Sequence, residues 1–248
     1  MSYAIEVFSN EWWINNVVSI FFISLLLFIS SKIKDNKEYL SKYTLVIGIF
    51  FISRLLWNQW YQNYLGQWDA EWSLPIQMCS FSSLLSGILP LLIYFNVNKK
   101  IQQVVFHFLF YWSIGAIYSL LTPQYTHGIQ GFIYYDYYVA HGGILFVVLF
   151  CIKYYGFSLR KHSWFKVFSY SQILLLFIHG VNRFIGGKAN YFYTVEPPIA
   201  DNPLVMGEFP FHIIVLDIFA LCHFFLFYII FKWYRKSNTN LVEEKIKA

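Results

Sequence analysis

Residues 211–234 read FHIIVLDIFALCHFFLFYIIFKWY, and this run is long and apolar enough to form a membrane-spanning helix. A helix needs about 20 mostly apolar residues to cross the hydrocarbon core of a bilayer, because each residue advances about 1.5 Å. The basic residues Lys232, Arg235 and Lys236 lie at the end of the run. The segment therefore predicts a transmembrane helix that ends at a charged membrane surface.

Six similar runs precede this one, so the sequence predicts an all-α, polytopic membrane bundle that forms a single domain over residues 1–248. The runs show no strict alternation of polar and apolar residues, which favours helices over β-barrel strands. The chain is 58% hydrophobic and 12% charged, whereas soluble domains carry about 25% charged residues. The seven predicted transmembrane helices are residues 13–33, 43–62, 74–95, 101–122, 134–156, 164–186 and 211–234.

The charges between these runs predict the orientation in the membrane. Basic residues cluster in alternate connections and in the tail: Lys32, Lys34, Lys37, Lys42, Lys99, Lys100, Lys153, Arg160, Lys161, Lys166, Lys232, Arg235 and Lys236. The opposite side carries mainly acidic residues, namely Glu6, Glu11, Asp69, Glu71, Asp136, Glu196 and Glu208. Cytoplasmic loops are enriched in Lys and Arg, so we expect an outside N-terminus and a cytoplasmic C-terminus. Lys far outnumbers Arg, and Ile, Asn, Tyr and Phe are frequent, which indicates an AT-rich bacterial genome. We therefore expect the membrane to be a bacterial plasma membrane.

Polar residues inside the predicted helices gather at one depth. Arg54, Asn58 and Gln62 recur every four residues and therefore share a helix face. Other helices place polar side chains near the same outer surface: Gln77, Cys79, Tyr137, His141, Gln172, His179, Asn182, Arg183, His212 and Asp217. Ionisable groups in membrane helices are costly and usually face the interior. We expect a polar cavity open to the outer leaflet, although hydrogen bonds that only join helices would give the same pattern.

Cys79 and His141 are the candidate catalytic residues of this cavity. A nucleophilic cysteine needs a base, since the thiolate is the reactive form. The alternative for Cys79 is inert packing, and the alternative for His141 is a hydrogen-bonded core histidine. A metal site built from His141, His179, His212 and Asp217 is a weaker alternative, because no short ligand spacing supports it. We expect neither a metal nor a cofactor.

Short motifs around these residues resemble a known family, the bacterial YwaF-type membrane proteins and eukaryotic transmembrane protein 164. The matching stretches are Leu74-Pro75-Ile76-Gln77-Met78-Cys79-Ser80, Leu121-Thr122-Pro123, His141-Gly142, Asn190-Tyr191 and Gly207-Glu208-Phe209-Pro210. The eukaryotic relative is regarded as a cysteine-dependent acyltransferase that builds ether phospholipids. The resemblance implies a nucleophile at Cys79 and a partner histidine at His141. The family commonly has histidine where this chain has Gln77.

These observations lead to the hypothesis of a lipid acyltransferase that works through a Cys79–His141 pair. Gln77 is the expected oxyanion donor, and Arg54 or Arg183 is expected to hold a phosphate head group. The remaining candidate substrate-binding residues are Asn58, His179, Asn190, Tyr191 and Asp217. The expected partners are membrane lipids and not nucleic acids, since no nucleic-acid motif is present. Two alternatives stay open: a transporter or lipid-binding protein with a non-catalytic cavity, and a purely structural membrane component.

Overall fold

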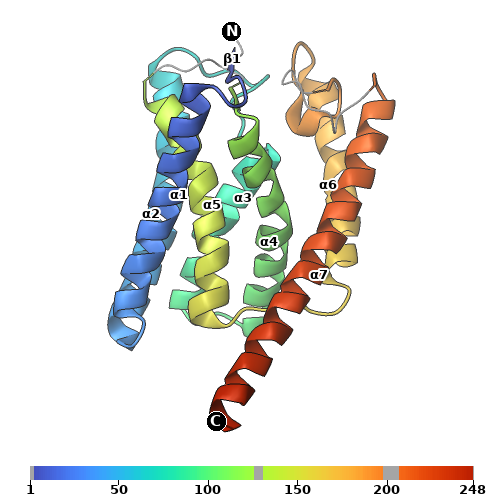
Figure 1. The fold of residues 1–248 in the computed structure, drawn as a ribbon. Helices are drawn as coiled ribbons and strands as arrows, with labels where there is room; N and C mark the ends of the chain where they lie inside the picture. Colours follow the sequence, from blue (N-terminus) through green and yellow to red (C-terminus); the bar gives the residue numbers. More distant parts are fainter. Residues whose placement is uncertain (1–2, 126–130, 198–206, 248) are drawn as a thin grey trace.

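The computed structural model describes residues 3–125, 131–197 and 207–247, with side chains up to Lys236. Helices dominate this part of the chain, which confirms the predicted all-α class (Figure 1). The elements are β1 (Tyr3–Ala4), α1 (Asn10–Ile33), α2 (Lys37–Tyr64), α3 (Met78–Tyr94), α4 (Lys99–Leu121), β2 (Gln124–Tyr125), α5 (Phe132–Tyr155), α6 (Ser163–Ile185), the 3-10 turn η1 (Tyr191–Tyr193) and α7 (Phe211–Lys247). β1 and β2 form a short antiparallel pair in which Tyr3 faces Tyr125.

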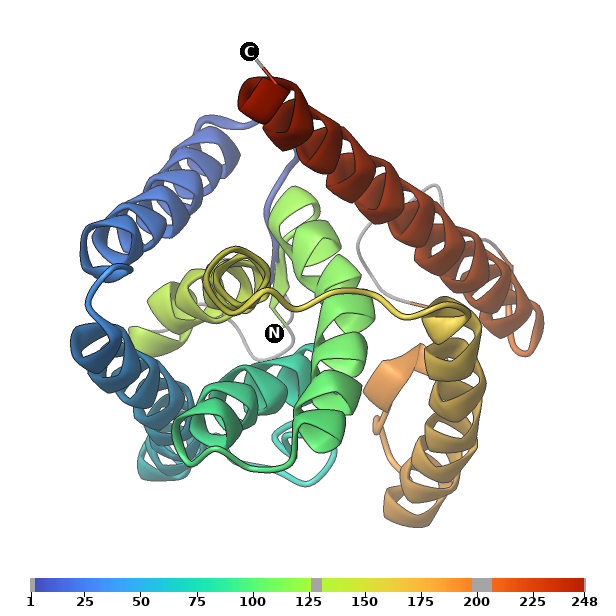
Figure 2. The ribbon, with the colours of Figure 1, turned by 90° about the horizontal axis from the view of Figure 1, so that it is seen from below.

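The helices form a central group with a flanking pair. α5 packs against α1, α2, α3 and α4, which surround it when the molecule is seen from below (Figure 2). α6 and α7 pack against each other and contact α4. Much of α1, α6 and α7 therefore presents exposed apolar side chains, including Phe21, Leu176 and Phe225. Such surfaces suit contact with lipid.

Six of the described helices are long and apolar enough to cross a membrane. The seventh, α3, is shorter, with 17 residues. It begins at Met78 and not at the predicted position 74. Pro75 disfavours helical backbone at the residue before it, and Gln77 has the extended angles of an N-cap residue (φ −73°, ψ 155°). The helix is therefore preceded by a bent segment at residues 74–77, and Cys79 lies in the first turn of α3.

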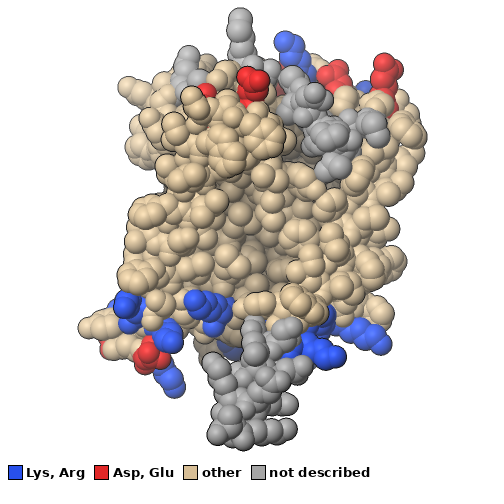
Figure 3. Space-filling view, viewed as in Figure 1, with Lys and Arg blue, Asp and Glu red and all other residues tan. Residues whose placement is uncertain are grey.

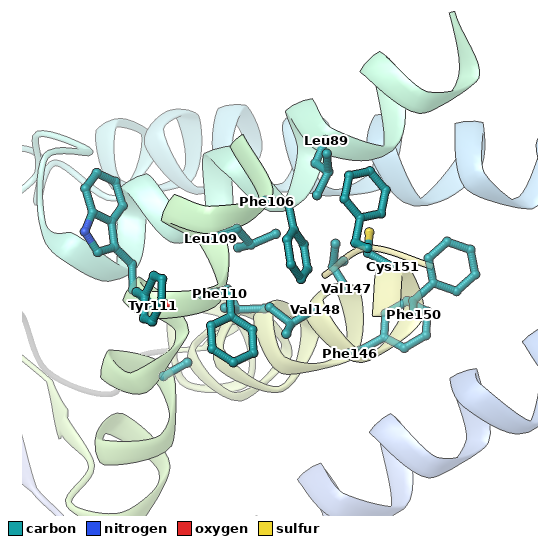
Figure 4. Packing of buried hydrophobic residues seen from close by; sticks show 14 of the residues in the cluster. Leu89, Phe106, Leu109, Phe110, Tyr111, Phe146, Val147, Val148, Phe150 and Cys151 are labelled. Carbon is teal, nitrogen blue, oxygen red and sulfur yellow. The ribbon is translucent and has the colours of Figure 1, made fainter. Parts of the chain in front are cut away.

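The inner part of the bundle is packed with large apolar side chains from α3, α4 and α5 (Figure 4). Leu89, Phe106, Leu109, Phe150 and Cys151 are fully buried there, which agrees with a packing role for Cys151. α2 and α3 approach closely on one side of this core. A Cβ added at Gly48 would meet Leu91 at 2.7 Å and the carbonyl oxygen of Gly87 at 3.1 Å. Small residues thus allow the two helix backbones to approach, as is common between membrane helices.

The two ends of the molecule differ in charge. On the face shown in Figure 3, most Lys and Arg side chains lie at the lower end, where α7 ends. Asp and Glu side chains lie mainly at the upper end, and the wide band between them carries almost no charge. Residues 187–197 and 207–210, between α6 and α7, lie at the upper end, and η1 lies within the first of these stretches. Residues 198–206, between the two stretches, lie outside the described part of the chain.

Candidate functional site

A cavity of about 500 Å³ lies among the upper ends of α2, α3, α4, α5 and α7, beside η1. Its wall includes six of the predicted site residues, namely Arg54, Asn58, Gln77, Cys79, His141 and Asp217. These residues come from four helices and from the segment before α3. The shared depth that the sequence indicated therefore corresponds to a shared cavity in the structure.

The polar face of α2 is anchored by a buried ion pair. Arg54 Nη1 donates to Asp136 Oδ2 at 2.6 Å, and Asn58 Nδ2 donates to the same oxygen at 2.7 Å. Gln62 donates in turn to Asn58 Oδ1 at 2.6 Å. The guanidinium of Arg54 also donates to Ser83 of α3. The spacing in α2 correctly predicted this face, and the network joins α2 to both α3 and α5.

Asp136 is the main correction to the sequence interpretation, which counted it among the acidic residues of the outer surface. It lies in α5, with 5% of its side chain exposed, and it neutralises Arg54. The available signal was its position inside the predicted helix 134–156, five residues before His141. The ion pair neutralises the charge of Arg54, and the binding of a phosphate head group by Arg54 stays a prediction.

Cys79 lies against α4. Its sulfur is 3.5 Å from the hydroxyl oxygen of Ser119, within hydrogen-bonding distance. A Cβ added at Gly115, one turn earlier in α4, would lie 3.6 Å from the same sulfur. The absence of a side chain at Gly115 therefore keeps space beside the thiol. Ser119 was not identified from the sequence, where it is one of two serines, with Ser113, in the predicted helix 101–122.

His141 is held by its own helix in a defined orientation. Its Nδ1 lies 2.6 Å from the backbone carbonyl oxygen of Tyr137. A carbonyl can only accept, so Nδ1 must carry the proton, and in the neutral ring Nε2 then has a free electron pair. The ring of Tyr137 packs against His141 with centroids 4.2 Å apart, and the Tyr137 hydroxyl donates to the carbonyl of Ser119 at 2.8 Å. Tyr137 thus connects His141 to the part of α4 that contacts Cys79.

Cys79 and His141 line one cavity, but they are not hydrogen-bonded to each other in the described part of the chain. The hydrogen-bonding partner of the Cys79 sulfur there is Ser119. The two predicted residues therefore share one cavity, and direct proton transfer between them stays a prediction.

Gln77 is oriented by η1. The backbone N–H of Phe192 donates to Gln77 Oε1 at 2.9 Å, which fixes which end of the amide is oxygen. The amide nitrogen of Gln77 has no hydrogen-bond partner among the described residues and remains able to donate. This arrangement is compatible with the predicted role of Gln77 as an oxyanion donor.

Four other predicted residues lie away from the cavity wall: His179, Arg183, Asn190 and Tyr191. Asn190 bonds the backbone of residues 195 and 196, and His179 Nδ1 bonds the carbonyl of Thr194 at 3.1 Å. Arg183 is exposed, and its guanidinium lies 5.5 Å from the ring of Phe209. These contacts hold residues 190–196 and Phe209 near the end of α6.

Tyr191, the first residue of η1, is fully buried. Asn182 of α6 accepts from its backbone N–H at 2.9 Å and donates to its carbonyl at 2.8 Å. The Tyr191 hydroxyl donates to the carbonyl of Ala70 and accepts from the N–H of Leu74. Burial raises the pKa of Tyr191 to about 12, so the hydroxyl keeps its proton at neutral pH and continues to donate.

The alternative metal site is not assembled. His212 Nε2 bonds the carbonyl of Tyr193 at 2.8 Å, and His179 bonds Thr194, so both rings are directed at the connection near η1. Asp217 accepts from Gln172 at 3.1 Å. In the described ranges, no three His, Cys, Asp or Glu side chains come close enough together to hold a metal ion.

The cavity also contains a hydrogen-bonded pair that the sequence did not assign to the site. His223 lines the cavity, and its Nε2 lies 2.6 Å from the hydroxyl of Tyr118. His107 contacts Gln103 and the backbone N–H of Arg160 and does not line the cavity.

The model of the TMEM164 family matches residues 7–228. No curated protein and no solved structure matches the chain. The matched range begins before α1 and ends in α7, so it contains every element that builds the cavity. The chain is thus a multi-pass helical membrane protein that belongs to the TMEM164 family.

Proposed function

We propose that the chain crosses the plasma membrane of a bacterium seven times as a single domain, with its N-terminus outside and its C-terminus in the cytoplasm. The separation of charges between the two ends supports this orientation. α3 spans about 25 Å at about 1.5 Å per residue, slightly less than a bilayer core. Residues 72–75 and 77, in the segment before it, line the cavity, and non-helical backbone at membrane depth is tolerated where it lines a cavity.

Within this topology, we propose that the protein is a cysteine-dependent acyltransferase that acts on membrane lipids. The observation that carries the proposal is the placement of Cys79, His141 and Gln77 around one cavity with complementary hydrogen-bonding states. His141 has a free electron pair on Nε2, Gln77 has a free amide nitrogen, and Cys79 lies beside the open space left by Gly115.

In the proposed reaction, His141 Nε2 takes the proton of the Cys79 thiol. The thiolate then attacks the ester carbonyl of a lipid, and Gln77 donates to the oxygen that becomes negative. Collapse releases the alcohol, which receives its proton from His141, and leaves an acyl thioester on Cys79. A second substrate then accepts the acyl chain. Cys79 and His141 would approach each other on substrate binding, because catalytic hydrogen bonds are often long without substrate.

A second candidate is a lipid-binding protein with the same cavity but no chemistry. The hydrogen bond between Cys79 and Ser119 favours it, because that contact also suits a purely structural cysteine. A transporter has less support. His107 bonds the α5–α6 connection and lies apart from the cavity wall, so the described polar residues do not continue through it as a path.

Cysteine variants separate these candidates. Cys79→Ser keeps a group that can bond Ser119 but is a far weaker nucleophile than a thiolate, and Cys79→Ala loses both properties. Cys222 is exposed on α7, so Cys222→Ala is the matched control. Membranes would be incubated with a phospholipid that carries a labelled acyl chain.

The acyltransferase predicts that Cys79→Ser, Cys79→Ala and His141→Ala each lower labelled product by at least about 100-fold, while Cys222→Ala matches wild type. Lipid binding without chemistry predicts no labelled product from wild type, and therefore no difference in product between wild type and Cys79→Ser. Equal product from wild type and Cys79→Ala would refute the enzyme.

A further inference from the structure

Tyr118 of α4 and His223 of α7 form a hydrogen-bonded couple inside the cavity. His223 Nδ1 lies 2.6 Å from the carbonyl oxygen of Phe219, so Nδ1 must be the donor. Nε2 of the neutral ring is then an acceptor, and it receives the hydroxyl proton of Tyr118 across 2.6 Å. The phenol oxygen still has electron pairs that can accept a hydrogen bond from a ligand.

This couple lies on the side of α4 that contacts Cys79. Gly115, Tyr118 and Ser119 are spaced at i, i+3 and i+4 and share one helix face. Gly115 and Ser119 both approach the Cys79 sulfur, and Tyr118 and His223 line the same cavity. A ligand that fills the cavity beside Cys79 can therefore reach the Tyr118 hydroxyl.

Two other tyrosine hydroxyls in the described core bond a different kind of group. Tyr155 of α5 bonds Thr44 of α2 at 2.6 Å, and Tyr111 bonds Ser163 at 2.9 Å. Those partners are hydroxyls, which join helices but take up no proton at neutral pH. Tyr118 instead bonds an imidazole, whose Nε2 electron pair can accept a proton.

We propose that Tyr118 and His223 activate the acyl acceptor in the second half of the reaction, and that this acceptor is an alcohol. The inference rests on the proposed acyltransferase function. It assigns two bases to two half-reactions: His141 serves Cys79, and the Tyr118–His223 couple serves the acceptor. Tyr118 is the catalytic residue, and His223 acts through it as a positioning residue and proton store.

The step balances as follows. The acceptor hydroxyl donates a hydrogen bond to the Tyr118 oxygen, and its own oxygen attacks the thioester carbonyl of acylated Cys79. As the new C–O bond forms, the acceptor proton passes to Tyr118 while the Tyr118 proton passes to His223 Nε2. The C–S bond then breaks, and its electron pair stays on sulfur. The proton returns from His223 through Tyr118 to the thiolate, which leaves an ester, a thiol and a neutral imidazole.

The test measures the two half-reactions separately on the full chain in lipid nanodiscs. The donor is a phospholipid with a labelled acyl chain, and the acceptor is a lysophospholipid with a free glycerol hydroxyl. Thioester formation is followed without acceptor, and loss of the thioester is followed after acceptor is added. The variants are Tyr118→Phe and His223→Gln, and Tyr155→Phe is the control because it loses a 2.6 Å hydrogen bond away from the cavity.

We expect both variants to form the thioester at nearly the wild-type rate but to transfer it about 100-fold more slowly, as loss of general base catalysis predicts. His223→Gln is decisive, because glutamine can still accept from Tyr118 and join the helices but cannot take the proton. Should Tyr118→Phe fail to fold, His223→Gln alone decides. Tyr155→Phe should behave as wild type does.

Three results would overturn the inference. Transfer within about 3-fold of wild type in His223→Gln would show that the couple only joins helices, and the proposed function would stand. Loss of thioester formation in a folded His223→Gln protein would place the couple in the first half-reaction. Absence of any thioester in wild type would refute the proposed function together with this inference.

Discussion

Replacement of Asp136 by alanine is expected to be among the most destabilising single changes in the cavity wall. Asp136 Oδ2 accepts from Arg54 and Asn58, and the side chains of Arg54 and Asp136 are only 7% and 5% exposed. The variant would leave the Arg54 guanidinium buried without a counter-charge. Removal of one partner from a buried ion pair costs about 3–5 kcal/mol.

The corresponding fall in melting temperature is about 6–20 °C, at about 2–4 °C per kcal/mol for a chain of this size. Tryptophan fluorescence during heating in detergent micelles would measure it. Glu38→Ala is the control, because its ion pair with Lys42 is about two-thirds exposed (71% and 64%) and is worth at most about 1 kcal/mol. The double variant Arg54→Met, Asp136→Leu should recover most of the loss, since it removes both buried charges. A melting temperature for Asp136→Ala within about 2 °C of that of Glu38→Ala would refute the reasoning.

Two further predictions concern the space beside the thiol and the order of the connection after α6. Gly115→Leu should slow the labelling of Cys79 by a maleimide at least about tenfold, because the Cβ alone comes within 3.6 Å of the sulfur. Gly180→Leu should leave the labelling rate of Cys79 unchanged, because a Cβ at Gly180 meets nothing within 4 Å. Equal labelling rates in the two variants would contradict the cavity geometry. Asn182→Ala should make the connection more sensitive to limited proteolysis, since the buried N–H and carbonyl of Tyr191 each lose a partner at about 1–3 kcal/mol. An unchanged rate of proteolytic cleavage would show that Asn182 does not hold Tyr191 and its neighbours in place.

Helical spacing and depth in the sequence were sufficient to predict much of the cavity wall. Arg54, Asn58 and Gln62 share a face because they recur every four residues. Cys79 lies in the first turn of α3 and His141 in the upper half of α5, and both line one cavity. Spacing within one helix is a local property, so these features could be predicted without knowledge of helix packing.

Partners across helices could not be predicted in the same way. Asp136 is the counter-ion of Arg54 because α5 lies in the centre of the bundle beside α2, and the order of helices in the sequence does not fix that neighbourhood. The polar residues of α6, such as Asn182, were recognised in the sequence. Their contacts with η1 depend on how residues 187–197 pack against the end of α6. Ser119 and His223 were missed because single polar residues in apolar runs are common and usually structural.

The central claim is that Cys79 carries an acyl chain during the reaction. Mass spectrometry of the purified protein after incubation with a labelled phospholipid tests it directly, with Cys151 and Cys222 as internal comparisons. The account predicts a hydroxylamine-sensitive acyl group on Cys79 in wild type, its absence in His141→Ala, and no acyl group on Cys151 or Cys222. A folded wild-type protein whose Cys79 reacts with a maleimide but never acquires an acyl group would contradict the account.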